Sequence, residues 1–140
     1  MSVLNKFKLN EGQQIADLFF ALNMPNKFVI LVSEYAHGNI ETKFYVVDKI
    51  NLCIHFIKNR YSKFNKEKSD YKHIEEEYIE EKKYFYLTSQ YGPDDNNNIF
   101  STKIQIHGIN ESQYYKIQKK VKKIFGNKLF GFYDHDSYDG

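Results

Sequence analysis

The chain has 140 residues, with 20 lysines and arginines against 18 aspartates and glutamates, so its net charge is +2 at pH 7. A charge this small does not by itself imply a nucleic-acid partner, and the single cysteine, Cys53, excludes an intramolecular disulfide. We expect one globular domain over residues 1–140 in the cytoplasm, because the sequence has neither a secretory signal nor a run long enough to span a membrane.

The first element expected is a helix from Asn10 to about Asn23. Asn10 and Gln13 have the spacing of a capping box, and apolar residues follow at helical intervals: Ile15, Leu18, Phe19 and Leu22. Residues 27–35 and 40–48 are rich in β-formers and are expected to be strands. The intervening Gly and Asn predict a hairpin turn.

Residues 51–58 are apolar at both odd and even positions. This pattern fits a strand buried on both faces and equally a buried helix, and we favour the strand. Residues 59–70 are polar and are expected to form a loop or a frayed helix start. Helical spacing of Tyr71, Ile74 and Tyr78 then predicts a helix to about Glu81.

Residues 83–91 have strand character, and the Gly-, Pro- and Asn-rich residues 92–98 predict a hairpin to the alternating strand 100–107. Asn110 and Gln113 form a second capping box and open a helix with apolar residues at helical spacing: Tyr114, Ile117, Val121, Ile124 and Phe125. Gly126 ends this helix, and residues 129–133 resemble a last strand.

The predicted order is therefore α-β-β-β-α-β-β-α-β. This order indicates an α+β fold, a mostly antiparallel sheet of five to six strands with about three helices packed on one face. Residues 134–140 are expected to be a flexible acidic tail.

Charge is concentrated in an acidic run, Glu75, Glu76, Glu77, Glu80 and Glu81. On a helix, the pairs Glu76–Glu80 and Glu77–Glu81 bring like charges together at i,i+4, which destabilises the helix. A chain that tolerates this repulsion either has a solvated face there or presents a surface to a basic partner. We predict a partner-binding surface made of this run together with Asp134 and Asp136 of the tail.

The alternative surface is basic. Lys116, Lys119, Lys120 and Lys123 span about 100° of the last predicted helix, opposite its apolar stripe. Such a ridge can bind nucleic-acid phosphates, although lysines near a helix C-terminus also suit the helix dipole.

No arrangement of residues predicts a catalytic centre, a metal site or a cofactor. Residues 94–105 begin like an EF-hand loop but have Ile99 and Gln105 where the motif needs Gly and Glu. Cys53 and His55 share a face if residues 51–58 form a strand, but no third, orienting residue accompanies them. A nuclease assembled from the scattered histidines is the enzymatic alternative.

We therefore predict a non-enzymatic protein-binding inhibitor. In size and character the chain resembles the small single-domain inhibitors of bacteria and phages, such as immunity proteins, which implies a basic toxin or effector as the partner. Abundant Asn, Lys, Ile and Tyr favour a source with an AT-rich genome. The alternative function is nucleic-acid binding through the lysine ridge.

Overall fold

The computed structural model describes residues 5–9, 13–62, 71–93 and 95–126. Its elements follow in the order β1 (Asn5–Leu9), α1 (Gln13–Leu22), β2 (Phe28–Ala36), β3 (Asn39–Val47), α2 (Ile50–Arg60), β4 (Tyr71–Ile79), the 3₁₀ turn η2 (Glu80–Lys82), β5 (Tyr84–Tyr91), β6 (Phe100–His107) and α4 (Glu111–Phe125).

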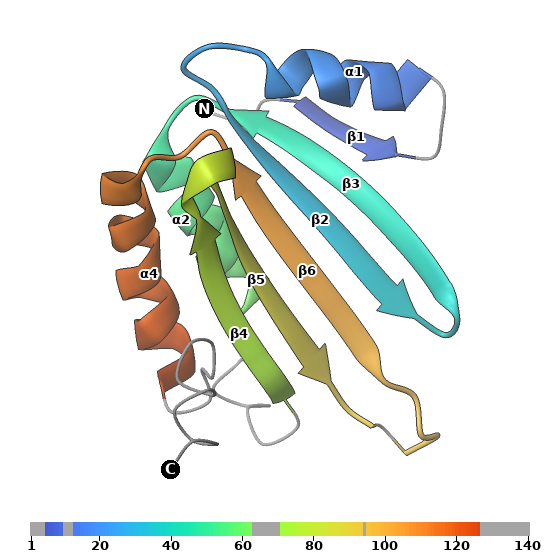
Figure 1. Cartoon of the computed structure of the whole chain (residues 1–140). Helices are drawn as coiled ribbons and strands as arrows, with labels where there is room; N and C mark the ends of the chain where they lie inside the picture. Colours follow the sequence, from blue (N-terminus) through green and yellow to red (C-terminus); the bar gives the residue numbers. More distant parts are fainter. Residues whose placement is uncertain (1–4, 10–12, 63–70, 94, 127–140) are drawn as a thin grey trace.

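The strands form one six-stranded sheet in the order β1-β3-β2-β6-β5-β4, and every neighbouring pair is antiparallel (Figure 1). The predicted α+β class, with a mostly antiparallel sheet and three helices, is confirmed. Both predicted hairpins are present, since β2 pairs with β3 and β5 pairs with β6. The described order differs from the predicted one in two internal segments and in the additional strand β1.

Helices α2 and α4 cover one face of the sheet, which we call the helix face. Side chains alternate along a strand, so Ile30 and Val32 of β2 point to this face and join Ile104 and Ile106 of β6. The helices add Cys53 and Ile57 from α2, and Ile117, Val121 and Phe125 from α4. This cluster is the main core.

Helix α1 packs against the opposite face, at the end of the sheet that β1 and β3 form (Figure 1). Ala21 of α1 contacts a second, smaller buried cluster that contains Val29, Phe44 and Val46, which alternate with the residues of the main core. The expectation of helices on one face therefore applies to α2 and α4, while α1 lies apart from them.

The strand predicted for residues 51–58 is wrong, because these residues lie in helix α2. Cys53 and Ile57, four residues apart, are the buried positions and face the sheet. Leu52, Ile54 and Phe56 are partly buried around them. A helix that packs against both a sheet and a neighbouring helix is apolar on most sides. Its sequence therefore lacks the periodicity that distinguishes a helix from a buried strand.

The helix predicted from Tyr71 to Glu81 is also wrong, because Tyr71–Ile79 is the edge strand β4. The pairing of β4 with β5 shifts register between Lys72 and Glu75, where His73 has a positive φ of 52°. This bulge adds one residue to the strand, so Tyr71 and Ile74, three apart, both pack on the main core. The inserted residue therefore leaves two core-facing side chains three residues apart, which is the spacing expected of a helix.

Helix α4 begins as predicted. Asn110 Oδ1 accepts a hydrogen bond from the Gln113 backbone N–H at 2.8 Å, and Gln113 Oε1 accepts one from the Asn110 N–H at 2.9 Å. The helix ends at Phe125, with Gly126 as its C-cap. Asn10, the polar segment 63–70, the last strand predicted at 129–133, and Asp134 and Asp136 lie outside the described residues.

Gly108, which follows β6, has a φ of +94°, and a Cβ atom there would lie 2.7 Å from the Lys27 carbonyl oxygen. Gly38 has a similar φ of +80° with nothing within 4 Å of its Cβ position. We predict that Gly38→Ala lowers the free energy of unfolding by about 1–2 kcal/mol, the backbone cost alone. Gly108→Ala should cost about 1–3 kcal/mol more, because a backbone atom blocks the methyl group. Urea denaturation of both variants measures the difference, and equal losses would contradict the close approach.

Candidate functional site: three clefts on the helix face

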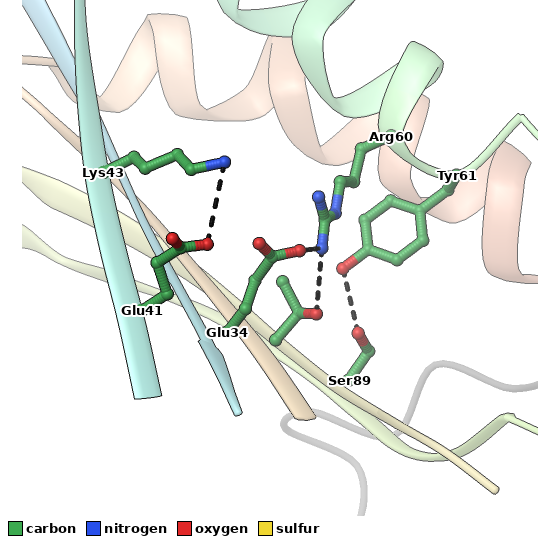
Figure 2. A network of polar contacts seen from close by, with 7 residues as sticks. Glu34, Glu41, Lys43, Arg60, Tyr61 and Ser89 are labelled. Atoms are coloured by element: carbon green, nitrogen blue, oxygen red, sulfur yellow. Dashed lines mark hydrogen bonds and ion pairs between the residues drawn. The ribbon is translucent and has the colours of Figure 1, made fainter. Parts of the chain in front are cut away.

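A cleft of about 790 Å³, which we call the Arg60 cleft, lies where the C-terminal end of α2 meets β2 and β6. Arg60, the one arginine of the chain, pairs with Glu34 and donates a hydrogen bond to Thr102 Oγ1 at 3.2 Å (Figure 2). Beside it, Tyr61 Oη and Ser89 Oγ are 2.9 Å apart, and burial raises the pKa of Tyr61 to about 12. Arg60 and Tyr61, at the end of α2, therefore already bind groups of the sheet.

A second polar network joins β4 to α4. Glu76 is only 2% exposed, and its two carboxylate oxygens accept hydrogen bonds from Tyr114 Oη at 2.9 and 3.1 Å. Gln118 Nε2 donates a further bond to Glu76 Oε2 at 3.0 Å. Burial raises the pKa of Glu76, although these hydrogen bonds partly oppose the shift. Glu76 thus holds the helix against the edge strand.

The acidic residues around Glu76 line a cleft of about 680 Å³ between β4 and α4, which we call the acidic cleft. Its lining is Glu75, Glu76, Glu77, Tyr78, Glu80, Glu111, Tyr114, Tyr115, Gln118 and Lys122. Tyr114 stacks on Tyr78, with ring centroids 4.9 Å apart, while Tyr115 is 54% exposed. Five acidic residues and a single lysine therefore line this cleft, although Glu75 and Glu77, which alternate with Glu76 along β4, direct their side chains to the opposite face of the sheet.

The acidic run predicted as one surface is split, because successive side chains of β4 point to opposite faces of the sheet. Glu76 turns inward and is not available to a partner, whereas the other four carboxylates are half-buried or exposed: Glu75, Glu77, Glu80 and Glu81. The i,i+4 repulsion expected on a helix does not arise, since Glu80 and Glu81 lie in η2. Glu111, from the first turn of α4, is a contributor that the sequence analysis missed.

The lysines predicted for the alternative surface lie on α4, where Lys116, Lys119 and Lys123 are exposed and Lys120 is half-buried. Lys120 and Lys123 line a third cleft of about 550 Å³ between α2 and α4, which we call the basic cleft. Its other lining residues are His55, Lys58, Asn59, Tyr61, Ser62 and Ile124. The contribution of α2 was missed because its residues were read as a strand and a loop.

The structure separates Cys53 from His55, and His37 from His107. Cys53 and His55 are two apart on a helix, so the thiol is buried while the imidazole is exposed. Burial raises the pKa of Cys53 to about 12, which disfavours the reactive thiolate. His37 packs on Phe100 and His107 on Tyr84, and Phe100 and His107 are opposite ends of β6, about 23 Å apart at the strand rise.

Within the described ranges, no group of three or more His, Cys, Asp or Glu side chains is arranged to hold a metal ion. No helix in those ranges is long and apolar enough to cross a membrane. No family model matches the chain, and neither a curated protein nor a solved structure matches it.

The buried carboxylate should make stability depend on pH. Because the pKa of Glu76 is higher in the folded state, the folded state binds its proton more tightly, and stability falls as pH rises above 4.5, the ordinary pKa of a glutamate. We predict that Glu76→Gln removes this contribution, so that its free energy of unfolding falls less over pH 4.5–8 than that of the wild type.

Urea denaturation across this pH range measures the effect, and Glu80→Gln, at an exposed position, is the control. A Glu76→Gln curve parallel to the wild-type curve would contradict the buried ionisation.

Proposed function

We propose that this protein is a non-enzymatic binding protein that holds a basic segment of another protein in the acidic cleft. The observation that carries the proposal is that acidic residues of three elements, β4, η2 and α4, line one cleft beside a sheet edge. Carboxylates gathered in this way repel one another, and a partner's lysine or arginine side chains relieve that repulsion.

The contacts of these carboxylates indicate which of them can bind a partner. Glu76 is saturated by Tyr114 and Gln118, and Glu77 accepts a hydrogen bond from Tyr86 Oη at 2.9 Å. Glu75, Glu80 and Glu111 form no ion pair within the described part of the chain. These are the groups that a cationic partner can engage.

The position of β4 also favours a protein partner. It is the last strand of the sheet and pairs only with β5 among the described strands, so its outer backbone groups face away from the sheet. An extended peptide can add to such an edge by main-chain hydrogen bonds, with alternate side chains reaching into an adjacent cleft. Tyr115 adds an exposed aromatic ring of the kind enriched at interfaces.

In this proposal the protein neutralises its partner, as a bacterial immunity protein neutralises a basic toxin. The inhibitor role rests on the acidic docking surface and on the burial of the one thiol, which leaves Cys53 without an obvious chemical task. An unpaired cysteine also suits the reducing cytoplasm in which such an inhibitor would act.

The test uses a synthetic nonapeptide of alternating arginine and valine, which as a strand presents its arginines on one side. We predict that it binds the wild type, and that Glu80→Lys/Glu111→Lys weakens binding about tenfold or more. Two charge reversals remove two exposed ion pairs and add two repulsions, each of a few tenths to one kcal/mol. Isothermal titration calorimetry measures both affinities.

The matched control is Asp48→Lys/Asp95→Lys, which makes the same change of net charge at two exposed carboxylates outside the cleft. An equal loss of affinity in this control would show attraction by overall charge alone. Equal binding of a peptide with glutamate in place of arginine would also overturn the proposal.

A further inference from the structure

The basic cleft between α2 and α4 has the opposite character to the acidic cleft. Lys58 reaches it from the last turn of α2, and Lys120 and Lys123 from the C-terminal half of α4. His55, one turn before Asn59 on α2, lies at the same wall, and its ring Nε2 is 3.1 Å from Asn59 Nδ2. Three lysines from two helices therefore converge on a cleft of about 550 Å³.

None of the described residues that line the basic cleft is a carboxylate. Within the described residues, the two ion pairs are Lys43–Glu41 and Arg60–Glu34, and neither involves these lysines. The neighbouring Arg60 cleft differs, because there a carboxylate and a hydroxyl already engage the cation. Among the described residues, therefore, no carboxylate pairs with the lysines of the basic cleft, and a concave surface of one charge sign concentrates anions.

The helix dipole explains only part of this arrangement. Cations near a helix C-terminus are stabilised by its partial negative charge, which accounts for Lys58 and Lys123 individually. It does not account for Lys120, which lies more than a turn before the end of α4 and is half-buried toward the cleft. Bringing it beside Lys58 and Lys123 adds repulsion, and a bound anion would remove that repulsion.

Further lysines extend along α4 beyond the cleft, and we call this row the lysine track. Lys116 and Lys119 are exposed on α4, and together with Lys120 and Lys123 they cover about 10 Å of helix at 1.5 Å per residue. One phosphate cannot contact all of them, whereas successive phosphates of an extended strand can. We propose that the basic cleft and this track bind the phosphate backbone of single-stranded nucleic acid, with Lys58, Lys120 and Lys123 holding one phosphate in the cleft.

Fluorescence anisotropy of a labelled twelve-nucleotide single-stranded DNA, titrated with the full chain at several salt concentrations, tests the proposal. We expect binding at low salt, at least about tenfold weaker for Lys120→Glu/Lys123→Glu. The slope of log affinity against log salt should also decrease by about 0.7, since the two substitutions remove the one phosphate contact in the cleft and each such contact with a single strand contributes about 0.7.

The control Lys49→Glu/Lys82→Glu makes the same change of net charge at two exposed lysines that do not line the basic cleft, and it should weaken binding no more than about twofold. Thermal unfolding of both variants confirms that they fold. Absence of binding by the wild type, or an equal loss in the control, would overturn the proposal. Displacement of the DNA by an acidic peptide but not by inorganic phosphate would assign the cleft to a protein partner and would also overturn it.

Discussion

The bond network around Glu76 is the constraint on which both charged clefts depend. Tyr114 and Gln118, one turn apart on α4, both donate to this carboxylate of β4, so the helix has a fixed position over the sheet edge. A buried carboxylate that loses a partner is costly, typically several kcal/mol, which makes the contact specific as well as strong. Because Glu76 points inward, its neighbours Glu75 and Glu77 have the opposite orientation on the strand.

Helix α4 consequently has two different sides. Toward β4 it presents Tyr114 and Gln118 to the buried carboxylate, with Glu111 at the acidic cleft. Toward α2 it presents Lys120 and Lys123 to the basic cleft. Glu111 in its first turn and the lysines in its last turn also suit the helix dipole. The same charges therefore stabilise the helix and give its two ends opposite charge.

The sequence predicted correctly what local chemistry decides. The capping box of Asn110 and Gln113 is complete within four residues, and the hairpin between β2 and β3 needs only its Gly-containing turn. It failed for α2, whose apolar sides reflect tertiary packing, and for β4, whose bulge shifts Tyr71 into helical spacing with Ile74. It also could not show that Glu76 is buried, since its partners Tyr114 and Gln118 lie 38 and 42 residues away.

The most direct test of this account is a double-mutant cycle between Glu76 and Tyr114. The free energy of unfolding at pH 7 is measured by urea denaturation for the wild type, Glu76→Gln, Tyr114→Phe and the double variant. The account predicts a coupling energy of about 1–3 kcal/mol, with the double variant losing less than the sum of the single losses. A coupling below about 0.5 kcal/mol would show that the carboxylate and the hydroxyl act independently, and would contradict Glu76 as the residue that fixes α4.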